Sequence, residues 1–570
     1  MFKKINIKAI RESLALLVIA AMVGTIVSFV AQLFIISAKN IYDFIFNNQN
    51  FIITIDIGNL SLNLVPLLIC VPSSILVGLL MYKLKLPRWF GPADTIYAAH
   101  HHAGILDLKG GMGSTLASFI SISGGASVGI YGPLVHFGAT VSSFIRRQKF
   151  VPKIPHDIII GSGVAAAISA GFGAPLAGII FAHETVLRHF SMKAVAALAI
   201  SSMAANFSAT EIGIVSPPLL LTAIPFDMGD IIISLVIIGP LAAIVAMLFM
   251  KLVLFTGTIP TKINIKNWQA PIIAGFACGI CGLIFSEILG LGTDVLMSVI
   301  TSQLLFGYLL ALLVGKLILT SICIGFGFFG GLFSPALFLG GVLGAIIFQL
   351  PVTSANPELL SVLAVSGMAA VSSSVIGAPL TAIILVLELT GSYEYAIAAT
   401  FPIVVCSFIT SRVFANSVFD KQLISRGVEI TKGREQIRLN EAIIKNYIDS
   451  QYTKLKPTTS TENAIKLLTK SKTTEGYIVS EDNKYVGKIS LLNLINKNNS
   501  NLLDLTEKKP LILDPNSNLI YVIKKLSKFV GESIPIVNKK NNEMIGIISE
   551  NDVLQAYLDI SEEINQIEKH

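Results

Sequence analysis

The chain has 570 residues, of which 53% are hydrophobic and only 14% charged, and its mean hydropathy is +0.73. This composition excludes an ordinary soluble enzyme and indicates a polytopic membrane protein. The net charge of +7 is mild, and no stripe of basic and aromatic residues marks a nucleic-acid partner. No catalytic constellation is visible, so we expect neither an enzyme nor a metal site.

The N-terminal region carries four basic residues before a 24-residue uncharged run, 13–36. This run is long enough to span a bilayer and longer than the core of a signal peptide. We therefore expect a retained first membrane helix. The basic flank predicts a cytoplasmic N-terminus by the positive-inside rule.

The most distinctive stretch is GGASVGIYGPLVHFGA, residues 124–139, which holds five glycines, one proline and no charge. Pro133 is expected in the first turn of a helix, where its missing N–H is not needed. The glycine-rich loop before it would leave amide groups free at the helix start, and such a start attracts anions. Irregular backbone at membrane depth is stable only where protein covers it or where it lines a cavity. The stretch predicts an anion site near the bilayer midplane.

An internal repeat relates the two halves of the apolar region. The segments 163–184 and 367–388 align at an offset of 204 residues, share Gly-Ala-Pro-Leu, and end on Glu184 and Glu388. We interpret both glutamates as structural capping or pairing groups rather than proton carriers.

A second pair of segments, 129–138 and 331–340, aligns at the similar offset of 202 residues and superimposes Pro133 on Pro335. Two matched pairs at one spacing indicate a duplicated half of about 200 residues, with one glycine-proline helix start in each half. His136, one turn into the first of these helices, is expected to pack with a hydrogen bond.

The pattern changes after residue 420. Residues 421–570 hold 22 of the 42 Lys and Arg and 19 of the 35 Asp and Glu, as a soluble domain would. The segments 486–494 and 545–553 match at an offset of 59 residues, and each predicts a strand that ends in serine and leads into a helix.

These motifs resemble those of the CLC family of chloride channels and chloride/proton antiporters. The family stretch G-K/R-E-G-P reads GIYGP at 129–133, G-x-F-x-P reads GLFSP at 331–335, and G-S-G-I-P reads GPADT at 91–95. The tail resembles a pair of cystathionine-β-synthase (CBS) domains. The expected boundaries are 1–425 for the membrane domain, 426–445 for a linker, and 446–503 and 504–562 for the two CBS domains.

The resemblance implies an all-α polytopic membrane domain, built from two repeated halves with broken helices, followed by an α/β CBS pair. Sequence alone leaves open whether the halves are inverted, although inversion is the commoner arrangement. The resemblance also implies a homodimer in the lipid bilayer, in a bacterial inner membrane with both termini cytoplasmic. The residues expected at the anion path are Gly129, Ile130, Tyr131, Gly132, Gly331, Leu332, Phe333, Ala93 and Phe419.

The chain departs from the antiporter pattern at several of these positions. Tyr131 stands where the family has a gating glutamate, and Thr185 stands where the antiporters have an internal proton-admitting glutamate. Ala93 and Phe419 stand at the positions expected to offer hydroxyl groups. We infer passive, proton-uncoupled conduction of chloride or a similar anion, with Tyr131 as the local constriction.

Two other functions stay open. One is a chloride/proton antiporter of the same fold, in which another acid carries the proton. The other is a nucleotide-responsive sensor whose membrane part has lost transport. Passive anion conduction requires no cofactor. Ser549 and Asp552, however, resemble the CBS signature for an adenine nucleotide, and the first copy has Asn493 in place of the aspartate.

Overall fold

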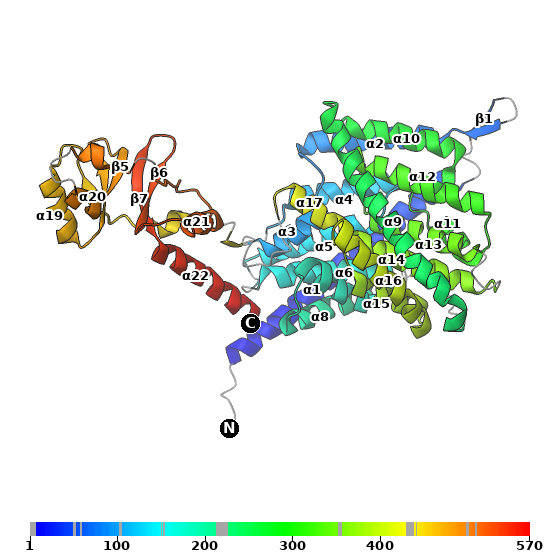
Figure 1. The fold of residues 1–570 in the computed structure, drawn as a ribbon. Helices are drawn as coiled ribbons and strands as arrows, with labels where there is room; N and C mark the ends of the chain where they lie inside the picture. The colour runs from blue at the N-terminus through cyan, green and yellow to red at the C-terminus, as the bar shows by residue number, and fades with distance from the viewer. Residues whose placement is uncertain are drawn as a thin grey trace, which may run out of the picture. The chain divides into compact units, whose positions relative to one another are not determined.

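The computed structural model describes residues 7–48, 53–57, 60–101, 105–149, 151, 154–211, 226–350, 356–428, 438–439, 442–496, 501–507 and 510–569. The chain forms two compact units, Met1–Val428 and Glu429–His570 (Figure 1). Within the described residues, the first unit is helical apart from the antiparallel hairpin of β1 (Thr54–Ile57) and β2 (Leu60–Asn63).

The described part of the first unit contains two successive series of helices and one final helix. The first series is α1 (Ile7–Phe46), α2 (Val65–Leu84), α3 (Pro92–His100), α4 (Leu108–Ser123), α5 (Tyr131–Arg146), α6 (His156–Phe172), α7 (Pro175–Phe181) with the π-helix η2 (Ala182–Leu187), and α8 (Met192–Glu211). The second series is α9 (Met228–Lys262), α10 (Ala270–Ile284) with the 3-10 turn η3 (Ser286–Ile288), α11 (Thr293–Thr301), α12 (Phe306–Gly325), α13 (Phe333–Phe348), α14 (Leu359–Ile376), α15 (Pro379–Thr390) and α16 (Tyr393–Val413). The final helix is α17 (Val418–Ser425).

The two series confirm the duplication predicted from the sequence. Helices α3 and α11 have 9 residues each, and α5 and α13 have 16 residues each. Pro133 lies in the first turn of α5 and Pro335 in the first turn of α13, as their spacing predicts.

The membrane character follows from helix length. Within the described ranges, seven helices have at least 18 residues and are apolar enough to cross a bilayer. The shorter apolar helices of 10–17 residues are His156–Phe172, Pro175–Leu187, Ala270–Ile284, Phe333–Phe348 and Pro379–Thr390. Long helices together with shorter ones give the broken-helix, multi-pass architecture that the sequence predicts.

Glycines set the distance between the helices that carry the site. Gly138 of α5 lies against the Gly163 backbone of α6, and Gly340 of α13 lies against the Gly367 backbone of α14. A Cβ at either position would overlap the neighbouring main chain, so only glycine permits this contact. The same small-residue contact therefore fixes the site helix in both halves.

The second unit repeats one βαββα pattern. Its first copy has β3 (Lys454–Leu455), α19 (Thr461–Ser471), β4 (Glu475–Val479), β5 (Tyr485–Ser490) and α20 (Leu491–Asn496). Its second copy has α21 (Leu519–Leu526), β6 (Ser533–Asn538), β7 (Glu543–Ser549) and α22 (Glu550–Lys569). The 3-10 turns η5 (Ile444–Tyr447) and η6 (Leu502–Leu505) complete the unit.

The strand pairing agrees in the two copies. Strand β3 is parallel to β4, which is antiparallel to β5, and the antiparallel β6 and β7 are accompanied by a single parallel bridge, Leu513–Ile536. The last strand of each copy, β5 or β7, ends in a serine, Ser490 or Ser549, directly before a helix. This confirms the strand-serine-helix pattern predicted for the tail.

Candidate functional site

The two glycine-proline loops meet in the interior of the first unit. The Gly129 amide donates to the Gly331 carbonyl at 2.8 Å, and the Gly331 amide donates to the Gly129 carbonyl at 2.5 Å. This single antiparallel bridge joins residues that the repeat aligns with each other. Helices α5 and α13 begin two residues beyond it, at Tyr131 and Phe333. The two helix starts that the repeat identifies therefore lie side by side.

Glycine is required on both sides of this bridge. A Cβ at Gly129 would lie 2.7 Å from Ser334 Oγ and 2.9 Å from the Gly331 carbonyl oxygen. A Cβ at Gly331 would lie 2.6 Å from the Gly132 amide nitrogen. These separations are shorter than any normal contact, so the loops approach each other only because they lack side chains. We refer to this bridge and the two helix starts as the crossing.

A cavity of about 540 Å³ lies at the crossing. Its lining includes the start of four helices, at Pro92 of α3, Tyr131 of α5, Phe333 of α13 and Phe419 of α17. Each helix start carries a partial positive charge from the helix dipole, and side chains cap two of the four: Asp94 accepts from the Gly91 amide at α3, and Ser417 Oγ accepts from the Asp420 amide at α17. The convergence of four such ends favours an anion, and the described lining adds two arginines, Arg88 and Arg426, and one carboxylate, Asp94.

The cavity separates the predicted path residues into two groups. Tyr131, Gly132, Gly331, Leu332, Phe333 and Phe419 line it. Gly129 lies behind them in the bridge, and Ile130 and Ala93 are buried, with exposed fractions of 5% and 2%. Ala93 is therefore not the residue of its motif that faces the cavity. Gly91, Pro92 and Asp94 of the same motif line the wall instead.

Tyr131 lies within a group of three aromatic rings. Its ring stacks on Phe172 with a centroid separation of 3.6 Å and an interplanar angle of 13°, and it meets Phe333 edge-on at 5.8 Å. Phe172 and Phe333 also contact each other edge-on at 5.2 Å. The Tyr131 side chain is only 6% exposed. These rings form an apolar cluster at the wall of the cavity, and sequence reasoning did not identify Phe172 as a member.

Gly171 makes room for the Tyr131 ring. A Cβ at Gly171 would lie 2.9 Å from Tyr131 Cε1 and 3.1 Å from Cδ1. The ring therefore rests directly on the backbone of α6. Within the described residues, the Tyr131 hydroxyl makes no hydrogen bond, so its position is set by packing.

Glu184 and Glu388 each cap the start of a helix in the opposite half. Glu184 accepts hydrogen bonds from the Leu380 and Thr381 amides at 2.9 and 2.8 Å, and from Thr381 Oγ1 at 2.7 Å. Glu388 accepts from the Leu176 and Ala177 amides, both at 2.8 Å. Each carboxylate thus neutralises the start of α15 or α7, which confirms the capping role predicted for both residues.

Thr185 follows Glu184 in the π-helix η2 and does not line the cavity. Its side chain is 3% exposed, and its Oγ1 has no hydrogen-bond partner among the described residues. The Thr185 carbonyl accepts from Arg188 Nε at 3.3 Å, and the Arg188 guanidinium forms an ion pair with Asp420, next to Phe419. This ion pair connects η2 to the helix that supplies Phe419 to the cavity.

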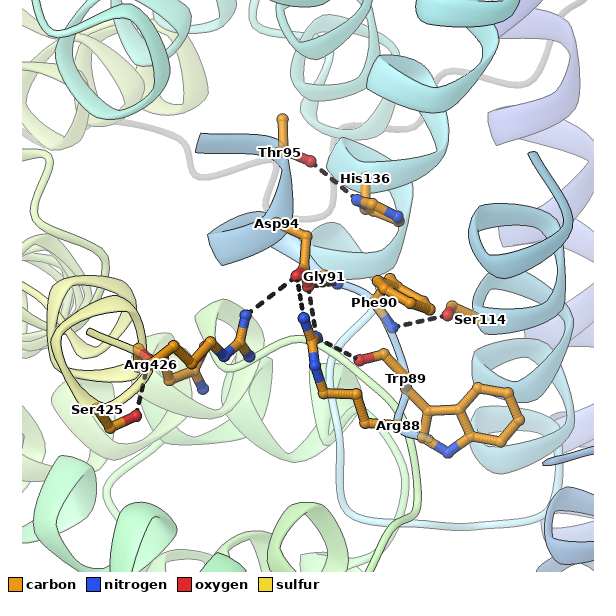
Figure 2. Close-up of polar contacts among 11 residues, drawn as sticks. Arg88, Trp89, Phe90, Gly91, Asp94, Thr95, Ser114, His136, Ser425 and Arg426 are labelled. Atoms are coloured by element: carbon orange, nitrogen blue, oxygen red, sulfur yellow. Dashed lines mark hydrogen bonds and ion pairs between the residues drawn. The ribbon is translucent and has the colours of Figure 1, made fainter. Parts of the chain in front are cut away.

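A charged cluster that sequence reasoning missed lies on the cavity wall (Figure 2). The Asp94 carboxylate accepts from Arg88 Nη1 at 2.9 Å and from Arg88 Nη2, and it accepts from Arg426 Nη1 at 3.0 Å. It also accepts from the Gly91 amide at 2.9 Å and so caps α3. Arg88 and Arg426 lie 338 residues apart, which is why no local pattern reveals the cluster.

His136 lies beside this cluster in Figure 2. Its Nδ1 is hydrogen-bonded to Thr95 Oγ1 at 2.9 Å, and its ring stacks on Phe90 with a centroid separation of 6.4 Å. This confirms the hydrogen-bonded packing role predicted for the histidine.

In the second unit, Ser549 and Asp552 are engaged with each other. Asp552 accepts from the Ser549 amide at 2.8 Å and from Ser549 Oγ at 2.7 Å, and the two residues together cap α22. In the first copy, Ser490 Oγ accepts from the Asn493 amide at 3.3 Å. Binding of an adenine nucleotide at these residues stays a prediction.

Comparison with known proteins gives consistent matches. Residues 73–412 match the family described as voltage gated chloride channel, and residues 503–559 match the CBS domain. The H(+)/Cl(-) exchange transporter ClcA of Klebsiella pneumoniae (strain 342) is 31% identical over 300 residues, which are 50% of this chain and 61% of the relative. The alignment thus spans less than two thirds of that relative. The voltage-gated ClC-type chloride channel ClcB of Salmonella typhimurium is 26% identical over 354 residues, 60% of this chain and 83% of the relative.

Solved structures share the fold. A slow cyanobacterial Cl-/H+ antiporter aligns with a TM-score of 0.63 at 21% identity, covering 72% of this chain and 98% of the other. A eukaryotic CLC transporter aligns with a TM-score of 0.62 at 14% identity, covering 95% of this chain and 98% of the other. At these identities the likeness concerns the fold alone.

Proposed function

Because the chain belongs to the voltage-gated chloride channel family, we propose that it conducts chloride or a similar anion passively, without coupling to protons, and that Tyr131 is the constriction. The observation that carries the proposal is that a phenol, packed between Phe172 and Phe333, occupies the start of α5 at the crossing. A phenol holds its proton at physiological pH, so it can neither take an anion's place as a charge nor exchange protons readily. It obstructs by its size.

The carboxylates of the described residues support the absence of a proton route. Asp94 is the one acidic residue in the described cavity lining, and two arginines hold it. Glu184 and Glu388 are committed to the starts of α15 and α7. Thr185 offers a hydroxyl where an exchanging carboxylate would be needed. Within the described cavity lining, a proton therefore finds no carboxylate other than the one that the two arginines hold.

The proposal is tested by flux measurements on the purified chain in proteoliposomes. An outward chloride gradient should drive chloride efflux, measured with an ion-selective electrode, while a pH-sensitive dye records no chloride-driven proton uptake. Proton uptake against its own gradient, in fixed proportion to chloride, would refute uncoupled conduction.

The constriction is tested by Tyr131→Ala. Removal of the ring should raise chloride flux about tenfold, the result of a barrier lowered by roughly 1.4 kcal/mol. Phe401→Ala serves as the matched control, because Phe401 is an exposed aromatic residue that does not line the cavity. An unchanged flux in Tyr131→Ala would show that the ring does not obstruct the path.

A chloride/proton exchanger is the second candidate, favoured by the names of the Klebsiella relative and of the cyanobacterial antiporter. It would require a proton carrier other than residues 131 and 185. The same dye measurement distinguishes the candidates, since an exchanger acidifies or alkalinises the vesicle as chloride moves.

The assembly and placement of the chain form part of the proposal. We expect a homodimer with one anion path per subunit, in a bacterial inner membrane with both termini in the cytoplasm. Light scattering of the detergent-solubilised chain should give twice the chain mass of 61.0 kDa after subtraction of the detergent. Protease protection of tags at both ends, in right-side-out vesicles, checks the orientation.

A further inference from the structure

Cysteines from different helices meet in the interior of the first unit. Cys70 of α2, Cys278 of α10 and Cys323 of α12 are all fully buried. The sulfurs of Cys278 and Cys323 lie 3.1 Å apart. Because a disulfide holds its sulfurs about 2.05 Å apart, an approach of about 1 Å would bring these two into bonding distance. The proposed conduction gives these thiols no role.

A buried lysine lies beside this pair of thiols. Lys316 lies two turns before Cys323 on α12, and its side chain is fully buried. Its ammonium donates to the Ile288 and Gly290 carbonyls at 3.1 and 2.8 Å. Among the described residues it forms no ion pair with a carboxylate, and the ionisable groups whose charge acts on it are the thiols of Cys323 and Cys278.

The lysine gives the pair the chemistry of a reactive thiol. Burying an ammonium without a counter-charge is costly. An ammonium next to a cysteine stabilises the thiolate, which is the form that attacks a peroxide. Cys278 is the better placed sulfur, because the thiols of both Cys70 and Cys323 donate toward it. Lys316 therefore activates one sulfur of a pair that is already in contact.

We propose that Cys278 and Cys323 are an oxidative modification site, which hydrogen peroxide converts to a disulfide that joins α10 to α12 and lowers anion conduction. First, the Cys278 thiolate attacks one peroxide oxygen, so that an S–O bond forms, the O–O bond breaks and hydroxide leaves. The Cys323 sulfur then attacks the sulfur of this sulfenic acid, the S–S bond forms, and the S–O bond breaks. The two protons of the thiols complete two molecules of water, and two electrons pass from the sulfurs to the peroxide.

The cavity provides a route for the oxidant. Ile324 and Gly325, the two residues after Cys323, line the cavity of about 540 Å³. The cavity therefore reaches the chain directly next to the pair. Hydrogen peroxide is small and uncharged, so it enters the protein interior at less cost than a charged oxidant.

The pair is connected to both glycine-proline loops, which links its oxidation to conduction. The Cys323 carbonyl accepts from the Phe328 amide at 2.9 Å, in the loop before α13. In the loop before α5, the Ser127 amide is directed at both sulfurs, and Ser127 Oγ is hydrogen-bonded to Thr320 Oγ1 at 3.0 Å. A disulfide removes the thiolate charge that this amide faces and draws the sulfurs together. Oxidation should therefore displace the loops that form the crossing.

The modification is tested by counting thiols on the full chain in detergent. The protein is treated with hydrogen peroxide, quenched with catalase, denatured and alkylated. It should lose two of its five reactive cysteines and regain both in dithiothreitol, and mass spectrometry should identify a cross-link between Cys278 and Cys323. The inference is wrong if all five thiols persist, if dithiothreitol does not restore them, or if other cysteines are joined.

Cys323→Ser should abolish the cross-link. Its matched control is Cys406→Ser, which removes another buried thiol, one that accepts from Ser374 Oγ at 3.0 Å in α14. Cys406→Ser should form the cross-link as the parent does. A cross-link that persisted in Cys323→Ser would overturn the assignment of the pair.

The role of the lysine is tested by the rate of oxidation. Lys316→Met should slow the loss of thiols about tenfold, because the thiolate loses its counter-charge. Lys251→Met, which removes an exposed lysine of α9, should leave the rate unchanged. A parental rate in Lys316→Met, with circular dichroism and thermal unfolding that match the parent, would refute activation by Lys316. If this variant does not fold, the thiol count of the parent still decides whether the cross-link forms.

The effect on conduction rests on the proposed function and has its own readout. In proteoliposomes, peroxide should lower chloride flux about threefold, dithiothreitol should restore it, and Cys323→Ser should not respond to peroxide. A cross-linked protein with unchanged flux would refute the effect on conduction. Proton-coupled flux together with the expected cross-link would refute uncoupled conduction and leave the modification site standing.

Discussion

The two halves of the membrane unit are alike in how their backbones are held. Glu184, at the end of the first half's segment, caps α15 of the second, and Glu388 caps α7 of the first. Gly129 of the first half and Gly331 of the second, which the repeat aligns, likewise exchange main-chain hydrogen bonds. Each half thus supplies the carboxylate that accepts hydrogen bonds from the amides at a helix start in the other half.

The side chains at the cavity differ between the halves. Tyr131 stacks on Phe172 and rests on Gly171, but the second half has Phe333 at the aligned helix start and Val375-Ile376 where the first has Gly171-Phe172. The second half therefore has no slot for a flat ring. The difference shows that the duplication is kept in the backbone of the two helix starts, whereas the side chains that line the shared cavity have diverged.

The largest effect is expected from a substitution that separates the two glycine-proline loops. Gly331→Ala places a Cβ 2.6 Å from the Gly132 amide, and relief of that overlap must separate the two loops. Overpacking of this kind costs about 1–3 kcal/mol. We expect chloride flux to fall at least tenfold, measured in proteoliposomes, together with a lower thermal unfolding temperature.

Gly307→Ala controls for this substitution, since a Cβ at Gly307 meets nothing within 4 Å. It should preserve flux and unfolding temperature. If Gly331→Ala retained full flux, close contact of the two loops would not be needed for conduction.

A smaller effect is expected from weakening the exchanged caps. Glu184→Gln and Glu388→Gln each leave an amide in place of a charged acceptor, at a cost of about 1–2 kcal/mol. Glu184 accepts three hydrogen bonds and Glu388 accepts two, so Glu184→Gln should be the more destabilising. Thermal unfolding in detergent gives the comparison.

Glu184→Gln and Glu388→Gln also test whether either glutamate carries protons. Because both glutamates act as caps in this structure, neither substitution should create or abolish proton movement in the dye measurement. Loss of a proton signal in Glu184→Gln alone would instead make Glu184 part of a proton route.

Much of this frame was predictable from the sequence. The offsets of 202 and 204 residues identify the duplicated halves, and Pro133 and Pro335 identify the two helix starts. Glycine and proline carry this information locally, because their backbone restrictions act whatever surrounds them. The capping role of Glu184 was also open to prediction, but the helix that it caps was not.

The contents of the cavity were harder to predict. Phe172 reads as one more apolar residue of a buried helix, and its stacking on Tyr131 depends on how α5 packs on α6. Arg426 meets Asp94 only after the chain has passed through the whole membrane unit. Within the motif at 91–95, Gly91, Pro92 and Asp94 line the wall and Ala93 does not, which depends on the direction in which α3 begins and cannot be read from spacing alone.

The slot beneath the ring allows a more selective test. Gly171→Ala should displace the Tyr131 ring, since the new Cβ would lie 2.9 Å from Cε1, and the result should be a flux about threefold higher than the parent's, a barrier change of roughly 0.7 kcal/mol. In the Tyr131→Ala background the same substitution should have no further effect. Additive effects on flux would show that Gly171 acts through something other than the ring.

The smallest effect is expected from removing the hydroxyl of Tyr131, the proposed constriction. In the described structure Tyr131 is held by ring contacts with Phe172 and Phe333, and its hydroxyl makes no hydrogen bond. Tyr131→Phe keeps those contacts, so chloride flux should change by less than about twofold, the range expected when no interaction is lost. A large fall in flux would mean that the O–H donates to the passing anion. That outcome would distinguish Tyr131 from Phe333, its apolar counterpart in the second half, by chemistry as well as by packing.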